Sequence, residues 1–206
     1  MISKIVIFTD LDGTLLHNET FEFENIRQYI KSLLSKNISI IPNSSKTKAE
    51  ILNFCHELKE ELPFIAENGA AIYKMNLINS DFPEKIILSR DKDEILNIFL
   101  KKIPKKFILK CKFVLKLKKD EQLKIFGLSE KQLSYASDRE FSVPLLFKGN
   151  KVEKNNLFRL ASDMGLTMQE GGRVINLSDN VCKSFAMKKV RRIFDKTEKQ
   201  ELKIIG

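Results

Sequence analysis

Two aspartates directly follow an apolar, β-branched run at the start of the chain, in the string Asp10-Leu11-Asp12-Gly13-Thr14. Carboxylates at positions i and i+2 of one loop can divide the work of phosphoryl transfer. One attacks phosphorus to form an aspartyl-phosphate, and the other protonates the leaving oxygen and then activates water. Two carboxylates and a phosphate repel one another, so this interpretation requires Mg²⁺ at Asp10 and Asp12. The alternative is an ordinary Asx-rich turn.

A hydroxyl group and an ammonium group are expected to complete a phosphate site. Ser44 follows a second apolar run, where its hydroxyl can hold a phosphate oxygen, and Ser45 is the competing choice. Both serines are alternatively loop or helix-capping residues. Lys183 stands at the predicted start of a late helix, where a cation opposes the helix dipole unless it faces an anion.

The elements that must position these side chains alternate in type through the first third of the chain. Apolar spacing predicts strands at residues 4–9, 38–41, 64–66 and 70–73, and helices at residues 22–36 and 46–60. This alternation is typical of an α/β fold with a parallel sheet, which binds ligands at the carboxyl ends of its strands. Asp10, Asp12, Ser44 and Lys183 are therefore expected to converge there in one cleft.

The pattern changes to α+β after about residue 80. Strands are predicted at residues 86–88, 108–117, 141–147 and 174–177, and helices at residues 91–102, 129–138 and 153–164. A helix at residues 181–195 and a strand at residues 202–205 then resume the earlier pattern. We expect a core domain formed by residues 1–80 and 178–206, with a cap domain at residues 81–177.

Composition restricts the class of protein. The 206 residues are 43% hydrophobic and 31% charged, and no apolar run approaches the roughly 20 residues of a membrane helix. Three widely spaced cysteines without a C-x-x-C pair predict reduced thiols in a cytoplasmic protein. With only two histidines, a His-based metal site or a Ser-His-Asp triad is hard to build.

The net charge of +9 would attract anions, either nucleic acid or phosphorylated metabolites. The charge comes from 29 Lys and 7 Arg, and nine lysines fall within residues 101–119. Nucleic-acid binders more often combine Arg with aromatic stacking partners, and no such interleaving occurs here. We expect solvated surface lysines and a small-molecule substrate, with neither a nucleic acid nor a membrane as partner.

Four further segments narrow the interpretation: residues 43–50 (NSSKTKAE), 67–73 (ENGAAIY), 139–145 (REFSVPL) and 171–173 (GGR). Together with the aspartate loop, they resemble the mannosyl-3-phosphoglycerate phosphatases, including glucosyl-specific relatives, of the haloacid dehalogenase (HAD) superfamily. The resemblance covers nearly the whole chain. It implies a HAD-type Rossmann-like core with an inserted α+β cap, Mg²⁺ as cofactor, and hydrolysis of a phosphorylated glycosylglycerate to a compatible solute.

The resemblance also assigns roles to named residues. It implies that Asp10 is the nucleophile, that Asp12 is the general acid and base, and that Ser44 and Lys183 hold the phosphate. Residues expected to line the substrate cleft are Ser45, Lys46, Glu67, Asn68, Arg139 and Arg173. The arginines can grip a carboxylate or phosphate in bidentate fashion, and Glu67 and Asn68 can bond sugar hydroxyls.

The chain departs from the family pattern at three places. Asn176 stands where the family usually has a histidine, and Cys182-Lys183-Ser184 replaces the usual Asp-Lys-Gly. The acidic fourth motif, which should follow the strand at residues 202–205, does not appear before Gly206. We expect the sequence to be part of a longer chain, and these 206 residues alone to bind Mg²⁺ weakly and turn over little substrate.

Two other functions stay open at this point. One is a HAD phosphatase for another sugar phosphate, of the trehalose- or sucrose-phosphate type. The other is a non-catalytic binding module that keeps the cleft. The sequence does not determine the oligomeric state or the sugar.

Overall fold

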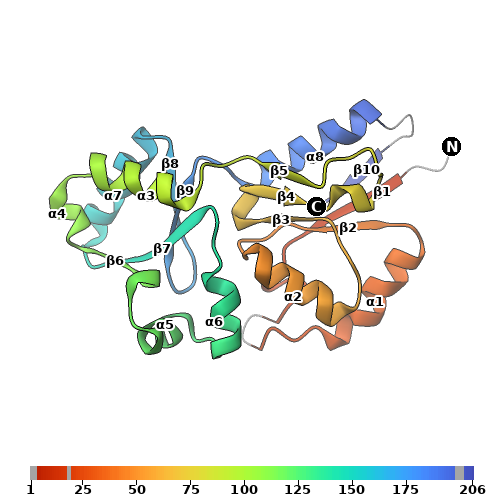
Figure 1. Ribbon diagram of the computed structural model, residues 1–206, viewed down its shortest axis with the longest axis horizontal. Helices are drawn as coiled ribbons and strands as arrows, with labels where there is room; N and C mark the ends of the chain where they lie inside the picture. The colour runs from red at the N-terminus through yellow and green to blue at the C-terminus, as the bar shows by residue number, and fades with distance from the viewer. Residues whose placement is uncertain (1–3, 18–19, 198–201) are drawn as a thin grey trace. The chain divides into compact units, whose positions relative to one another are not determined.

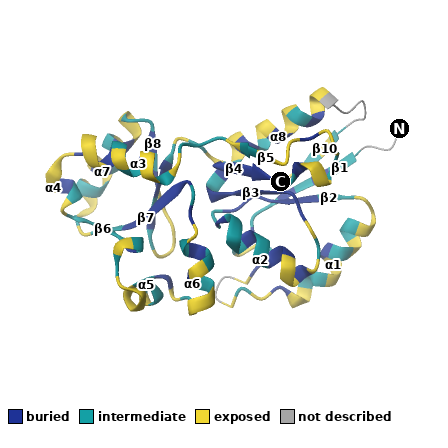
Figure 2. Ribbon diagram, in the orientation of Figure 1, coloured by how far each residue is buried: buried dark blue, intermediate teal, exposed yellow. Residues whose placement is uncertain are grey.

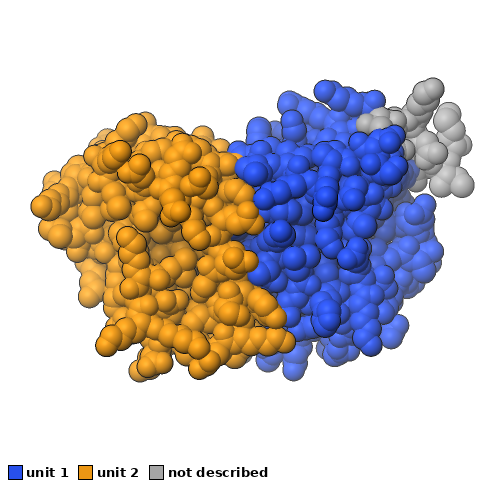
Figure 3. Space-filling view, viewed as in Figure 1, with its two compact units in different colours: residues 1–88, 182–206 blue, residues 89–181 orange. Residues whose placement is uncertain are grey.

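The computed structural model describes residues 4–17, 20–197 and 202–206, and the chain divides into two compact units (Figure 3). The first unit comprises residues 1–88 and 182–206, and the second comprises residues 89–181. The expected cap covered residues 81–177. The structure groups residues 81–88 with the first unit, because strand β5 (Lys85–Ile87) pairs with another strand of that unit. Residues 178–181 belong to the second unit.

A sheet lies at the centre of the first unit. Its parallel part has the order β10-β1-β2, formed by β10 (Leu202–Ile205), β1 (Lys4–Thr9) and β2 (Ser39–Pro42). Strands β3 (Phe64–Ala66), β4 (Ala71–Tyr73) and β5 continue as an antiparallel part. A parallel bridge between Asn43 and Ile65 connects the two parts. The carboxyl ends of β1, β2 and β3 therefore meet at one edge.

Three helices cover this sheet. Helices α1 (Glu24–Ser35) and α2 (Lys48–Leu58) lie over one face and α8 (Lys183–Thr197) over the other (Figure 1). Helix α8 buries Ala186, Val190 and Phe194, which recur every four residues and so share one helix face. They pack in one cluster with apolar side chains of β1, β2 and β3. Burial of a side chain as large as Phe194 contributes about 1.5–3 kcal/mol, so this contact fixes the helix on the sheet.

The second unit contains an antiparallel sheet of order β6-β7-β9-β8. Its strands are β6 (Cys111–Phe113), β7 (Ser142–Phe147), β8 (Leu166–Glu170) and β9 (Ile175–Asp179). Its helices are α3 (Lys92–Lys102), α4 (Lys105–Ile108), α5 (Lys119–Phe126), α6 (Glu130–Ser137) and α7 (Lys151–Asp163). Buried side chains of α3 and α7, including Phe99 and Leu157, pack against Leu145 and Leu177 of the sheet. Figure 2 shows the buried strands beside exposed outer helix faces.

One predicted strand and three omissions need correction. The strand expected at residues 108–117 extends only from Cys111 to Phe113, between α4 and a 3₁₀ turn at Val114–Lys116. The chain turns because Val114 is fully buried in a cluster with Phe126 and Leu133 of the neighbouring helices. Helices α4 and α5 and strand β8 were not predicted, although buried Leu166 and Met168 of β8 alternate with polar residues.

Short 3₁₀ turns complete the first unit, at Glu67–Gly69 and Met75–Leu77. Within the described residues, no helix combines the length and the apolar character that crossing a bilayer requires.

Candidate active site

The aspartate loop begins where β1 and β2 end side by side. Thr9, the last residue of β1, lies opposite Pro42, the last residue of β2. The next residues are therefore neighbours in space, and the backbone N–H of Asn43 donates to the Thr9 carbonyl at 2.7 Å. Asp10 thus leaves the sheet at its carboxyl edge, as the α/β pattern predicts for a ligand site.

A tight turn holds the two aspartates. The carbonyl of fully buried Leu11 accepts hydrogen bonds from the backbone N–H groups of Thr14, Leu15 and Leu16 at 3.2, 3.0 and 2.8 Å. Gly13 has φ +71°, a conformation that glycine adopts at little cost. The backbone N–H of Leu11 donates to Asp10 Oδ1 at 2.8 Å, which orients the first carboxylate.

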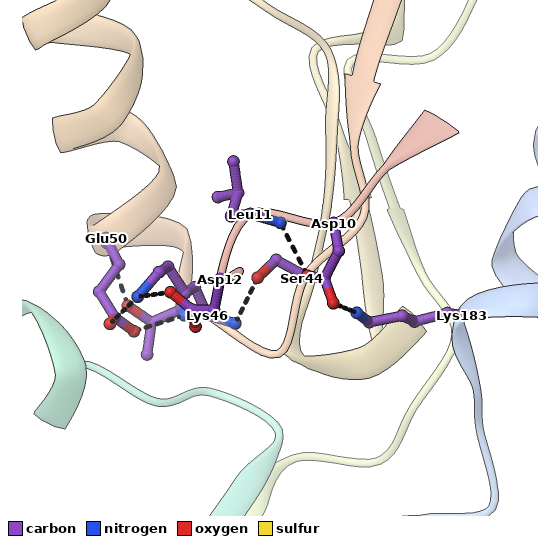
Figure 4. A network of polar contacts seen from close by, with 8 residues as sticks. Asp10, Leu11, Asp12, Ser44, Lys46, Glu50 and Lys183 are labelled. Carbon is purple, nitrogen blue, oxygen red and sulfur yellow. Dashed lines mark hydrogen bonds and ion pairs between the residues drawn. The ribbon is translucent and has the colours of Figure 1, made fainter. Parts of the chain in front are cut away.

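Lys183 meets Asp10 across 173 positions of sequence. Its Nζ lies 2.6 Å from Asp10 Oδ2 (Figure 4). Lys183 is the first residue of α8, and its side chain runs from the helix start to the aspartate loop. A cation at a helix N-terminus opposes the macrodipole, and the nearby carboxylate offsets that cost.

Two residues fix the start of α8. The side-chain Nδ2 of buried Asn43 donates to the Lys183 carbonyl at 3.3 Å. Gly69, at φ +99°, packs so closely that a Cβ there would lie 2.3 Å from the Cys182 carbonyl oxygen. Neither residue was predicted from the sequence to contact the start of α8. The available signal was position: Asn43 directly follows a strand, and Gly69 ends the ENG turn.

The thiol of Cys182, the residue before Lys183, has a shifted pKa. The pKa of exposed Cys182 lies below its ordinary value, chiefly because of its contact with the Ser184 hydroxyl, 3.2 Å away, and further because of backbone N–H groups at the helix start.

Lys46 joins the second aspartate to helix α2. Its Nζ lies 2.9 Å from Asp12 Oδ1 and 3.4 Å from Glu50 Oε1 (Figure 4). Its backbone N–H donates to Ser44 Oγ at 3.3 Å. Ser44 is fully buried and Ser45 is partly exposed, so the two serines differ in access to solvent.

The Glu67–Gly69 turn lies beside the Ser44–Lys46 segment. The backbone N–H of Glu67 donates to the Lys46 carbonyl and that of Asn68 to the Ser44 carbonyl, each at 2.9 Å. Glu67 and Asn68 have φ +46° and +59°, which costs about 1–2 kcal/mol per non-glycine residue. Such strain is typical of functional sites, where the surrounding structure holds it.

Arg139 and Arg173 belong to the second unit. Arg139 is buried, its Nη1 donates to Ser142 Oγ at 2.9 Å, and its Nε has no hydrogen-bond partner among the residues that the structure describes. Arg173 is exposed, and its Nη1 lies 2.9 Å from where a Cβ on Gly127 would stand. The structure thus gathers Asp10, Asp12, the serines, Lys46, Glu67, Asn68 and Lys183 within the first unit and carries both arginines on the second.

The donor set fits a hard cation only in part. Asp10 and Asp12 offer carboxylate oxygens on one loop, and Mg²⁺ is commonly bound by one or two carboxylates with waters and substrate phosphate. Across residues 4–17, 20–197 and 202–206, no group of three or more His, Cys, Asp or Glu side chains could hold a metal ion. The described residues therefore supply two carboxylates at most.

Comparison with known proteins settles the family. A model of the haloacid dehalogenase-like hydrolases matches residues 7–201. The chain belongs to the haloacid dehalogenase-like hydrolases. A glucosyl-3-phosphoglycerate/mannosyl-3-phosphoglycerate phosphatase from Persephonella marina is 33% identical over 200 residues, which cover 93% of this chain and 73% of that protein. A protein of the same name from Methanococcoides burtonii is 44% identical over 70 residues, 34% of this chain and 26% of that protein.

The solved structures agree on the fold. A crystal structure from Thermoplasma acidophilum, 16% identical, matches with a TM-score of 0.65 and covers 100% of this chain and 77% of its own. The expected α/β HAD fold and the resemblance to glycosylphosphoglycerate phosphatases are thereby confirmed.

Proposed function

We propose that this HAD phosphatase hydrolyses a glycosyl-3-phosphoglycerate, with mannose or glucose as the sugar, through an aspartyl-phosphate intermediate on Asp10. The observation that carries the proposal is the Asp10–Lys183 ion pair at the carboxyl end of β1, with Asp12 two residues away. The P. marina relative is named for both substrates, which supports this substrate class.

The chemistry divides between the two aspartates. A carboxylate oxygen of Asp10 attacks phosphorus and forms the acyl-phosphate, while the glycerate oxygen leaves with a proton from Asp12. Asp12, now ionised, takes a proton from water, and the resulting hydroxide attacks phosphorus to release inorganic phosphate and restore Asp10. Lys183 holds the Asp10 carboxylate in place before the attack and offsets negative charge on the phosphoryl group during it.

Mg²⁺ is the cofactor in this proposal, held by the Asp10 carboxylate and by Asp12 through its backbone carbonyl. When bound, the ion supplies charge neutralisation between the carboxylates and the phosphate. Waters and substrate oxygens would complete the coordination, since Mg²⁺ is commonly bound through only one or two carboxylates.

The substrate's other groups require further polar partners. In this proposal the hydroxyl of Ser44, or alternatively that of Ser45, binds a phosphate oxygen. Lys46, Glu67 and Asn68 contact the rest of the substrate. The buried Nε of Arg139, for which the described part of the chain offers no hydrogen-bond partner, supports an anion-binding role for that residue. Arg173 is proposed as a second, exposed anion contact.

The product in this proposal is mannosylglycerate or glucosylglycerate. It is made in the cytoplasm and serves as a compatible solute. Three free cysteines support a reducing compartment. A phosphorylated small molecule is the only partner in the proposal.

Phosphate release from a panel of substrates tests the function. The panel contains mannosyl- and glucosyl-3-phosphoglycerate, trehalose 6-phosphate and sucrose 6-phosphate, with and without Mg²⁺. It is run on the 206-residue chain and on any longer chain that its gene encodes. Preferential, Mg²⁺-dependent turnover of the glycosylphosphoglycerates supports the proposal. If a disaccharide phosphate is preferred, the proposed substrate is wrong and the protein is a disaccharide-phosphate phosphatase. If every chain tested binds substrate without turnover, the protein is a binding module.

A further inference from the structure

Glu50 combines a helix cap with an ion pair. Its Oε2 accepts a hydrogen bond from the Thr47 backbone N–H at 2.9 Å, and the Thr47 hydroxyl accepts one from the Glu50 backbone N–H at 3.1 Å. This capping box fixes the first turn of α2. The other carboxylate oxygen, Oε1, lies 3.4 Å from Lys46 Nζ. One carboxylate therefore links the start of helix α2 to the Lys46 ammonium group.

Lys46 lies between two carboxylates. Its Nζ is 2.9 Å from Asp12 Oδ1, and the side chains of Lys46 and Glu50 are only 12% and 16% exposed. Partly desolvated charges interact more strongly than charges at an open surface. The Phe21 ring, whose centroid lies 4.7 Å from Nζ, further restricts the ammonium group. Lys46 thus lies between Glu50 of α2 and Asp12 of the aspartate loop, with the shorter distance to Asp12.

We propose that Glu50 is a positioning residue: by holding the Lys46 ammonium, it sets where the Asp12 carboxylate lies. The inference rests on the proposed function, in which Asp12 transfers the proton. A neutral side chain at position 50 removes one of the two carboxylates that hold the Lys46 ammonium. The ammonium can then follow movements of Asp12 or of an anionic substrate. Proton transfer depends on the geometry of the transferring group, so the loss should appear in kcat.

The chain offers a matched control in the second unit. Glu153 caps α7 in the same way: its Oε2 accepts from the Asn150 backbone N–H at 3.1 Å, and its Oε1 pairs with Lys110. Glutamine sustains this motif, since Gln132 occupies the same place in the capping box of α6. Glu50→Gln and Glu153→Gln therefore both keep a cap and lose one ion pair, but only Glu50 is connected to Asp12.

The test is a double-mutant cycle on phosphate release. Glu50→Gln should lower kcat by about 3–10-fold with KM changed less than about 2-fold, and Glu153→Gln should leave both unchanged. In a Lys46→Ala background, Glu50→Gln should have little further effect, because the connection to Asp12 is already broken. An equal loss of kcat in both backgrounds overturns the inference, as does a change in KM alone. Thermal unfolding of both glutamine variants should give similar small shifts, and a much larger shift for Glu50→Gln would make its role structural.

A second measurement does not depend on turnover. The nuclear magnetic resonance signal of the Asp12 side-chain carboxyl carbon, assigned with Asp12→Asn, should shift in Glu50→Gln and stay in place in Glu153→Gln. An unshifted signal in Glu50→Gln overturns the positioning role even in an active enzyme. A shifted signal in a protein that hydrolyses none of the substrates supports the positioning role and rejects the proposed function.

Discussion

The ammonium group of Lys183 lies 2.6 Å from the carboxylate of Asp10, although 173 positions separate the two residues in the sequence. Asp10 follows strand β1, and Lys183 opens helix α8, which packs on the sheet through Ala186, Val190 and Phe194. The pair is therefore a product of helix-on-sheet packing. In the proposed reaction it orients the nucleophile and keeps it next to a cation.

Asp10→Asn should abolish phosphate release, because an amide cannot form the acyl-phosphate. The near-isosteric change should leave the fold intact, so the far-ultraviolet circular dichroism spectrum should match that of the parent. Phosphate release is measured by a colorimetric assay with the best substrate of the panel. Undiminished turnover in Asp10→Asn would rule out the covalent mechanism.

Asp12→Asn should slow turnover by about 10²–10⁴-fold, the usual contribution of general acid–base catalysis. In aryl phosphates with a good leaving group, the leaving oxygen needs little protonation. Asp12→Asn should therefore slow acyl-phosphate formation less with these substrates. The comparison uses single-turnover rates for p-nitrophenyl phosphate and for the best substrate of the panel. Equal losses on both substrates would contradict the acid role of Asp12.

Gly69→Ala should destabilise the protein by about 2–4 kcal/mol, because a methyl group would meet the Cys182 carbonyl at 2.3 Å and φ is +99°. Backbone movement that relieves the clash would shift the start of α8 and hence Lys183. Gly172→Ala is the matched control, since nothing lies within 4 Å of a Cβ at that position. Chemical denaturation measures both free energies of unfolding. Equal stability of the two variants would show that the close approach is unimportant.

Asp179→Asn should destabilise the protein by about 1–3 kcal/mol at neutral pH. The Asp179 carboxylate accepts hydrogen bonds from Arg90 Nε and Nη2 at 3.0 and 2.6 Å and from the Arg90 backbone N–H at 2.9 Å. The Arg90 guanidinium, opposed by partial burial, holds the pKa of Asp179 below its ordinary value. A lowered folded-state pKa means that this stability is fully present above the unfolded value of about 4 and is lost as the pH falls through the folded value.

The check for Asp179 is a series of unfolding curves from pH 7 downward. The difference between parent and Asp179→Asn should stay constant to about pH 5 and shrink below about pH 4. Asp195→Asn, which removes an exposed pair with Arg191 at 3.8 Å, should leave stability nearly unchanged throughout. A difference for Asp179→Asn that grows toward acid pH would contradict the predicted sign.

The sequence by itself determined the α/β class, the aspartate loop and most helices and strands of the first unit. These features depend on local patterns: apolar periodicity, a glycine at a turn, and carboxylates directly after a strand. In the second unit, local pattern was less reliable. The Lys-rich segment alternates like a strand at residues 108–117, yet Val114 turns inward and leaves β6 with three residues. Burial in a cluster that includes Phe126 and Leu133 outweighed the local preference.

Tertiary structure alone decided which groups meet. Among 29 lysines, only its place at a predicted helix start and its order along the chain pointed to Lys183 as the partner of Asp10. The contact of Asn43 with the Lys183 carbonyl, the approach of Gly69 to Cys182, and the place of Lys46 between Asp12 and Glu50 depend on strand register and helix packing. Apart from Lys46 and Glu50, which are four positions apart, those relations join residues distant in sequence, and only the folded chain brings them within a few ångströms of one another.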